Sequence, residues 1–228
     1  MAKFEVHELE GVNYVDITLD NESVRAEAGA LSYLKGDIRV HSKLLPSIPS
    51  AIKSFIAMQA IYRPTYTGSG VVTLLSSVGG FHIMHLDDEA WILERGIYWA
   101  SEGGVDVNFH RVDFWTAYRA REPLIYLQTK VRGSGQVAVR TRGPIELLTL
   151  GEGEKVAVDG RNVIGWSSDV RFRIRRPTDN FFGKFTSGQG RLRVFFGPGQ
   201  VLLNPAPHWR YRLFADDEND KPFIPWQE

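Results

Sequence analysis

The sequence predicts an all-β protein built from three internal repeats. Apolar and polar residues alternate with a period of two in segments 14–19, 136–140, 170–174 and 192–196. This pattern is typical of strands that turn alternate side chains toward a core. The 22 glycines among 228 residues suit the many turns and bulges of such a chain. Landmark motifs also recur along the chain, and they set the expected order of the strands.

The clearest recurrence has a spacing of 67 residues. Segment 27–40 aligns without gaps on segment 94–107, with matched glutamate and glycine near the start and matched Ile or Val near the end. The same spacing separates Trp99 from Trp166, which predicts a third copy of the motif around residue 166. Self-similarity of this kind indicates a fold assembled from repeated supersecondary units.

Glycine motifs mark the strand ends of each repeat. Three Gly-x-Gly motifs open alternating apolar runs, and a glycine turn follows each run. The motifs lie at 68–70, 133–135 and 188–190, and the turns lie at 79–80, 143 and 197–199. The recurring unit is therefore predicted to be strand, glycine turn, strand, acidic turn, strand, aromatic corner and strand.

We expect a single domain, residues 1–228, with three units at approximately 12–60, 61–125 and 126–210. The first unit lacks its opening hairpin and the last lacks its closing half, so the C-terminal strands are expected to complete the first unit. Three units around a pseudo-threefold axis would bury every sheet edge, and buried edges protect a β protein from aggregation.

Two segments interrupt the repeat and are predicted to contain short helices. Residues 50–61 place Ile52, Phe55 and Ile56 at helical spacing, and residues 112–121 are expected to form a second, shorter helical turn. The first helix is apolar on most sides, so something must cover it. It is either a lid on its own β core or a contact with another subunit or a membrane surface.

The composition excludes several classes of function. The chain has no cysteine, so it has no disulfide, thiolate nucleophile, cysteine zinc site or iron–sulfur cluster. Segment 1–10 lacks the apolar core of a signal peptide, and its three glutamates are unlike an arginine-rich mitochondrial presequence. No apolar run reaches the length of about 18 residues that a membrane span requires. We therefore expect a cytoplasmic protein.

Charge is balanced overall, with 27 basic and 27 acidic residues, but it is uneven along the chain. Residues 1–129 carry a net charge of −5, residues 130–212 carry +9, and residues 213–228 carry −4. This asymmetry indicates an anionic partner or charge-matched assembly, unless distant segments neutralise each other within one fold. In the acidic tail, Phe223 and Trp226 are predicted to dock into a groove of a neighbouring subunit.

Several of these motifs resemble those of the altered-inheritance-of-mitochondria, or mitochondrial biogenesis, family. The motifs lie at 27–33, 68–70, 133–137 and 197–201. The resemblance spans nearly the whole chain, and it implies a fold similar to that of the tryptophan RNA-binding attenuation protein. That fold is a short double-stranded β-helix (TRAP-like), here expected in three copies. The motifs are structural glycines and apolar runs, so the resemblance implies no catalytic residue.

A metal centre is the strongest enzymatic hypothesis. His82, His85 and Glu89 approach the cupin pattern, in which two histidines two residues apart share one face of a strand. Here the histidines are three residues apart and are expected on opposite faces, and the second half of the pattern is missing. A 2-His-1-carboxylate site is therefore a minor alternative. We predict no metal, no cofactor and no small-molecule substrate.

Arginines at alternate positions are the best binding candidates. Arg171, Arg173 and Arg175 alternate with apolar residues along one predicted strand. Further arginines at this spacing are Arg191, Arg193, Arg210 and Arg212. If these faces adjoin, they form a cationic surface for the phosphates of RNA or of an anionic membrane. Exposed sheet faces also carry charge for solubility alone.

The sequence favours a non-enzymatic scaffold or assembly protein that acts through protein–protein contacts and forms a homo-oligomer. Its candidate interface residues are Ile52, Phe55, Ile56, Phe223 and Trp226. The alternative is a module that binds an anionic polymer such as RNA, or an anionic membrane surface, through the arginine ladders. A cupin-like metal enzyme is the third and weakest alternative.

Overall fold

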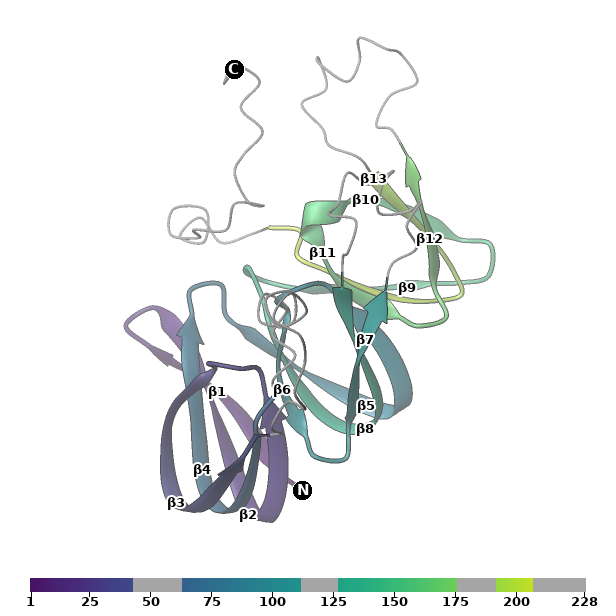
Figure 1. The fold of residues 1–228 in the computed structure, drawn as a ribbon. Coiled ribbons are helices and arrows are strands. Elements are labelled where there is room, and N and C mark those ends of the chain that lie inside the picture. The colour runs from purple at the N-terminus through teal and green to yellow at the C-terminus, as the bar shows by residue number, and fades with distance from the viewer. Residues whose placement is uncertain (43–62, 112–126, 176–191, 207–228) are drawn as a thin grey trace, which may run out of the picture.

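The structure, a computed structural model, describes residues 1–42, 63–111, 127–175 and 192–206 (Figure 1). These residues form antiparallel β-strands and one short 3-10 turn, which confirms the all-β class. Segments 50–61 and 112–121, which were expected to contain helices, lie outside the described residues.

The strands fall into three consecutive groups, called here the first, second and third units. The first unit contains β1 (Lys3–Leu9), β2 (Val12–Ala26), β3 (Leu31–His41) and β4 (Thr65–Ser77). The second contains β5 (Phe81–Leu93), β6 (Tyr98–Glu102), β7 (Asp106–Arg111) and β8 (Leu127–Arg140). The third contains β9 (Glu146–Leu150), β10 (Lys155–Asp159), η1 (Gly160–Asn162), β11 (Val163–Ser167), β12 (Arg171–Arg175), β13 (Leu192–Phe196) and β14 (Gly199–Leu203).

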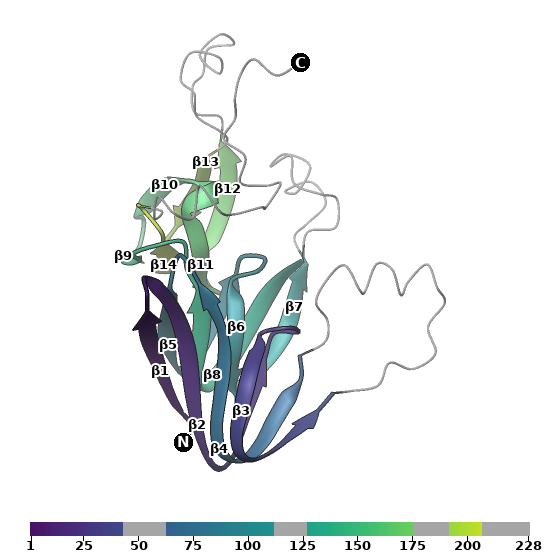
Figure 2. The same ribbon diagram turned by 90° about the vertical axis from the view of Figure 1, so that its left-hand side faces the viewer.

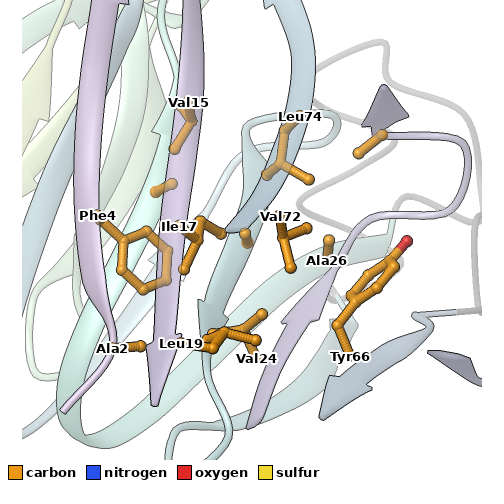
Figure 3. Close-up of a cluster of buried hydrophobic side chains, with 13 residues drawn as sticks. Ala2, Phe4, Val15, Ile17, Leu19, Val24, Ala26, Tyr66, Val72 and Leu74 are labelled. Carbon is orange, nitrogen blue, oxygen red and sulfur yellow. The ribbon is translucent and has the colours of Figure 1, made fainter. Parts of the chain in front are cut away.

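Each unit supplies most of one buried apolar cluster. In the first cluster, side chains from β1, β2 and β4 pack together, as Figure 3 shows for Phe4, Ile17 and Val72. The alternation seen in the sequence produces this core, because residues two apart on a strand share a face. In this division the Gly-x-Gly strand closes a unit, whereas the sequence repeat was expected to open with it.

Eleven of the described strands form one sheet, in the order β3-β4-β2-β6-β8-β5-β11-β14-β9, with β1 beside β2 and β7 beside β8. Strands β10, β13 and β12 form a second, three-stranded sheet. Figures 1 and 2 both show the first unit at one end of the molecule and the third unit at the other end.

The first two units share the register of their long strands. Leu19 pairs with Gly70 in the first unit, and Leu86 pairs with Gly135 in the second. In both units the ladder then shifts at a bulge before a glutamate three residues further along. The two leucines are 67 residues apart, so the spacing read from the sequence holds between these two units.

The serine of each Gly-Ser-Gly motif holds this bulge in place. Asn21 and Asp88 have left-handed φ values of 53° and 52°, which few residues other than glycine adopt. The backbone N–H of Asn21 donates to Ser69 Oγ at 2.9 Å, and that of Asp88 donates to Ser134 Oγ at 3.0 Å. The bulge and its serine are therefore one local device that occurs in both units.

The third unit departs from this pattern at the equivalent place. Leu150 pairs with Gly199, and Lys155 pairs with Phe196 as Ser23 pairs with Thr67, so four residues stand where the first two units have three. Both long strands are interrupted here: β9 and β14 belong to the large sheet, whereas β10 and β13 belong to the small one. Segment 197–199 thus holds the register of the Gly-x-Gly motif and does not form a hairpin between β13 and β14. The expected motif at 188–190 lies outside the described residues.

The match between Trp99 and Trp166 was wrong by two residues. Ala100 pairs with Ala138 in the second unit and Gly165 pairs with Leu202 in the third, so Trp166 occupies the position of Ser101. The two indoles also pack in different cores: Trp99 against the first cluster and Trp166 within the third. The two rings therefore do not mark one repeated position, and the second and third units are spaced by about 65 residues in these pairings.

The pseudo-threefold arrangement and the similarity to the tryptophan RNA-binding attenuation protein stay predictions. Within the described strands, the first unit is joined to the second and the second to the third. Strand β1 pairs with β2, and the last described strand, β14, pairs with β9 and β11. The C-terminal strands were expected to complete the first unit, and residues 207–228 lie outside the described part of the chain.

Candidate interaction surfaces

Two seams join the three units edge to edge through the same backbone pairing. The pairs of the first seam, between β2 and β6, are Val24–Glu102, Arg25–Ser101 and Ala26–Ala100. The pairs of the second seam, between β5 and β11, are Trp91–Ser167, Ile92–Trp166 and Leu93–Gly165. The long strands of the first two units align, so the two seams have one register.

The hydrogen bonds that flank the seams repeat as well. In the first seam, the N–H of Glu27 donates to Trp99 O and the N–H of Gly103 donates to Ser23 O, both at 2.8 Å. In the second, the equivalent bonds run from Glu94 N to Ile164 O at 2.9 Å and from Ser168 N to Ala90 O at 2.8 Å. One mode of unit-to-unit attachment is therefore used twice in this chain.

An acidic residue directly follows the long strand at each seam, and in the first seam it is Glu27. Arg63 Nε donates to Glu27 Oε2 at 3.2 Å, and Arg63 Nη2 donates to Thr129 Oγ1 of the second unit at 3.1 Å. The Arg63 guanidinium also lies 4.8 Å from the centre of the Tyr98 ring. Burial raises the pKa of Glu27, and the charge of Arg63 only partly opposes this effect. These contacts hold the first two units together.

The equivalent acid in the second unit, Glu94, lies in a buried polar cluster. Arg193 of the third unit forms an ion pair with it, and Gln128 Nε2 donates to Glu94 Oε1 at 3.0 Å. Arg193 is 5% exposed, and its guanidinium lies 5.4 Å from the centre of the Phe172 ring. Arg193 was predicted to lie on a cationic surface, and this prediction is wrong. Both faces of β13 are covered, so its alternate positions do not separate a buried face from an exposed one.

The ladder on β12 has the geometry that the sequence indicates. Arg171, Arg173 and Arg175 are exposed, whereas Phe172 and Ile174 between them are half-buried. The Phe172 ring packs within 5.5 Å of the Trp166 and Phe195 rings, centre to centre, which fixes the orientation of the strand. The guanidinium of Arg173 lies 5.7 Å from the centre of the Phe196 ring. Three cationic groups therefore line one face of β12, which ends the three-stranded sheet.

The proposed cupin-like residues do not form a compact cluster. His82 is half-buried, and burial together with the charge of His85 lowers its pKa. His85 is exposed on the opposite face of β5, and Glu89 Oε2 accepts a hydrogen bond from Trp91 Nε1 at 3.0 Å. No group of three or more acidic or histidine side chains in the described segments is arranged to hold a metal ion.

Several predicted contact residues lie outside the described residues. These are Arg191, Arg210 and Arg212 of the ladders, Ile52, Phe55 and Ile56 of the expected helix, and Phe223 and Trp226 of the acidic tail. Within the described ranges 1–42, 63–111, 127–175 and 192–206, no helix has the length and apolar character needed to cross a membrane.

One surface was not predicted from the sequence, the outer edge of β3. This strand ends the eleven-stranded sheet, and it pairs with β4 but with no other described strand. Tyr33 and Val40 on it are 53% and 50% exposed. The signal was present in the alignment of segments 27–40 and 94–107, because Tyr33 matches Ala100, a fully buried seam residue.

The fold is similar to one solved by crystallography. A Streptococcus pyogenes protein superposes with a TM-score of 0.69 and 18% sequence identity, over 91% of this chain and 94% of that one. At this identity the similarity shows the fold alone. No curated protein matches the chain. The sequence model of the family described as mitochondrial biogenesis AIM24 matches residues 4–206, so the chain belongs to this family.

Proposed function

We propose that this chain is a cytoplasmic, non-enzymatic scaffold that acts through contacts with other protein chains and forms a homo-oligomer. The observation that supports this best is the outer edge of β3, where Tyr33 and Val40 are each about half exposed. A sheet edge with unpaired backbone groups and large apolar side chains is a template for another chain, unless something protects it.

The buried charges of the molecule also fit a structural role. Glu27 is paired with Arg63, and Glu94 is paired with Arg193 across two units. The Glu94–Arg193 pair joins two units directly, and Arg63, which is paired with Glu27 of its own unit, also donates to Thr129 of the second unit. Such contacts are expected of groups that fix how the units attach. These acids are already engaged by cations in the folded chain, which favours architecture over acid–base chemistry.

Solution mass tests this proposal. We expect light scattering on the full chain to give a multiple of 25.8 kDa, with little change between low and high salt, because the contact is largely apolar and backbone-mediated. The double variant Tyr33→Ser/Val40→Ser should lower the mass. Leu75→Ser is the matched control, since Leu75 is 45% exposed on β4, which has a partner strand on both sides. A monomer at every concentration would contradict the proposal.

A second candidate function is binding of an anionic polymer such as RNA, and the exposed ladder on β12 supports it. Replacing Arg171, Arg173 and Arg175 with glutamine should remove salt-dependent binding of single-stranded RNA if the ladder is used. A charge-matched control replaces Arg39, Arg95 and Arg132, which are also exposed. Equal binding by both triple variants would exclude the ladder. Binding to phosphatidylserine vesicles in place of RNA would assign the ladder to a membrane.

A further inference from the structure

The strand pairing identifies one residue in each unit that occupies the same position, on the strand that lies beside the Gly-x-Gly strand. Tyr33 pairs with Thr73, Ala100 with Ala138 and Gly165 with Leu202, each on the Gly-x-Gly strand of its own unit. Tyr33, Ala100 and Gly165 are therefore equivalent. We call the strand segment around this position the leading edge of a unit: residues 31–35 in β3, Tyr98–Glu102 in β6 and Val163–Ser167 in β11.

A second equivalence defines the other side of each unit. Val24 pairs with Tyr66, Trp91 with Val131 and Val156 with Phe195. Val24, Trp91 and Val156 are therefore equivalent. We call this side the trailing edge, formed by residues 23–27 of the first unit, residues 90–94 of the second and Lys155–Asp159 of the third.

In both seams the trailing edge of one unit pairs with the leading edge of the next. Two edges are left over: the leading edge of the first unit, in β3, and the trailing edge of the third unit, in β10. Neither has a partner along this side among the described strands. Figures 1 and 2 place β3 and β10 at opposite ends of the molecule, so they do not meet within the chain.

We propose that these two leftover edges pair with each other between two copies of this chain, head to tail. The proposal rests on the scaffold function above and names its partner and its contact. Carried over from the two seams, the register pairs Val156 with Lys35, Ala157 with Leu34 and Val158 with Tyr33. The two seams within the chain already join such edges in this register, so the same backbone pairing can join a third pair of edges between two copies.

The backbone bonds of this contact follow from the same equivalence. The N–H of Asp159 donates to Ser32 O, as Glu27 N and Glu94 N donate to Trp99 O and Ile164 O in the seams. The N–H of Gly36 donates to Lys155 O, as those of Gly103 and Ser168 do to their partners. Main-chain bonds of this kind provide the affinity in strand addition.

Exposure along the leading edges agrees with this assignment. Ala100 is 0% exposed and Gly165 is buried in their seams, whereas Tyr33 at the same position is 53% exposed. The contact is heterologous, since it joins two different edges. Copies joined in this way form a closed ring if the rotation between them closes, and an open filament if it does not.

Disulfide cross-linking tests the register directly, because the chain has no cysteine of its own. The seam hydrogen bonds join residue 27 to 99 and 23 to 103, so the pair 24–102 is a non-hydrogen-bonded pair. Lys35 and Val156 occupy the equivalent pair, whose Cα atoms lie about 4.5 Å apart, within the range of a disulfide of roughly 4.4–6.8 Å.

The experiment mixes the full-length variant Lys35→Cys with the full-length variant Val156→Cys under mild oxidation. We expect a covalent dimer at least tenfold more abundant than with Arg39→Cys in place of Lys35→Cys. Arg39 is exposed on the same strand but lies four residues further along, about 13 Å away at 3.3 Å per residue. The double variant Lys35→Cys/Val156→Cys should give a ladder of covalent multimers.

Two results would overturn the inference. One is a cross-link that forms only within single chains of the double variant, because the two edges would then close on each other in one molecule. The other is no dimer above the Arg39→Cys control, as expected if the C-terminal segment covers an edge. If light scattering still gives an oligomer in that case, the scaffold proposal stands without this contact. If the mass is that of a monomer, both proposals fail.

Discussion

The first and second units have the same backbone but support it with different side chains. Each has a long strand, a bulge held by a serine, and a left-handed Gly after the acid, Gly29 with φ 79° and Gly96 with φ 73°. The acid itself has different partners. Glu27 is paired with Arg63, a residue of its own unit, whereas Glu94 is paired with Arg193 from the next unit.

This difference follows from the place of each unit in the chain. The second unit is joined to a neighbour on both sides, so its acid is buried at 6% exposure and needs a cation from the third unit. The first unit has a neighbour on only one side among the described strands. The repeat therefore conserves backbone positions, and the side chains differ according to what covers each unit. Four measurements test this comparison, in order of decreasing effect.

The largest effect is expected at the buried ion pair of the second unit. Arg193→Gln removes the cation and leaves the Glu94 carboxyl buried without this ion pair. Breaking a buried pair in this way costs about 3–5 kcal/mol of the free energy of unfolding. Arg63→Gln should cost less, because Glu27 has 17% of its side chain exposed. Urea denaturation of both variants measures the difference.

A double variant separates the loss of a charge from the loss of a contact. Glu94→Gln combined with Arg193→Gln leaves no unpaired charge, so it should recover more than half of the stability that Arg193→Gln alone loses. If Arg63→Gln and Arg193→Gln cost the same, the two units are supported alike and the comparison fails.

The next effect concerns the first glycine of the Gly-Ser-Gly motif. A Cβ at Gly68 would lie 2.0 Å from Asp37 O, because β3 runs directly beside it, and its φ is +142°. A Cβ at Gly133 would lie 3.5 Å from Gly104 O, in a turn, and its φ is +116°. Gly68→Ala should therefore cost about 3 kcal/mol or more, from overpacking and strain together, and Gly133→Ala about 1–2 kcal/mol, from strain alone.

Thermal unfolding of the two alanine variants provides the measurement. The two glycines occupy the same position of the same motif, so the sequence alone predicts that both variants lose the same free energy of unfolding. A larger loss of stability in Gly133→Ala than in Gly68→Ala would contradict the prediction. It would show that contact with β3 does not determine how strongly the alanine destabilises the fold.

The fold class and the first two repeats were predictable from the sequence because period-two alternation and glycine spacing are local signals. The register of the third unit was not predictable in this way. The matching tryptophans Trp99 and Trp166 suggested a spacing that the strand pairing contradicts. Pairing is set by contacts between distant segments, so the most conspicuous residues need not be the equivalent ones.

The candidate surfaces show the same limit. Alternation placed Arg171, Arg173 and Arg175 correctly, because β12 has one covered face and one exposed face. It failed for Arg193, because β13 lies between β10 and β12 and three of its five residues are buried in a row. The alignment of segments 27–40 and 94–107 matches Tyr33 with Ala100, but it does not show that β3 and β10 lack a neighbour on one side among the described strands, because that depends on the pairing of distant segments.

The third prediction concerns the stability of the fold at alkaline pH and depends on Tyr98, a buried tyrosine that has no counterpart in the first unit. Tyr98 occupies the position of Leu31, its hydroxyl donates to Arg25 O at 3.2 Å, and burial raises its pKa to about 12. The unfolded pKa is about 10, so folding disfavours the tyrosinate. This stability is fully present below pH 10 and is lost as the pH rises through about 12. The loss amounts to about 2–3 kcal/mol.

Urea denaturation between pH 8 and pH 12 measures this loss, with Tyr98→Phe as the control. The variant lacks the ionisable hydroxyl, so its stability should fall less steeply above pH 10 than that of the unaltered chain. Parallel curves for the two proteins would show that Tyr98 ionises in the folded state without cost.

The smallest effects are expected where the two units are most alike. Ser69→Ala and Ser134→Ala each remove one hydrogen bond to the backbone of a left-handed bulge residue, at 2.9 Å and 3.0 Å. Each bond is partly exposed to water, so each variant should lose about 1 kcal/mol of the free energy of unfolding. The expected result is equality, measured by urea denaturation of both variants. A loss of stability in only one of the two variants would contradict this expectation. It would mean that the serine stabilises the bulge in one unit, whereas other contacts stabilise it in the other unit.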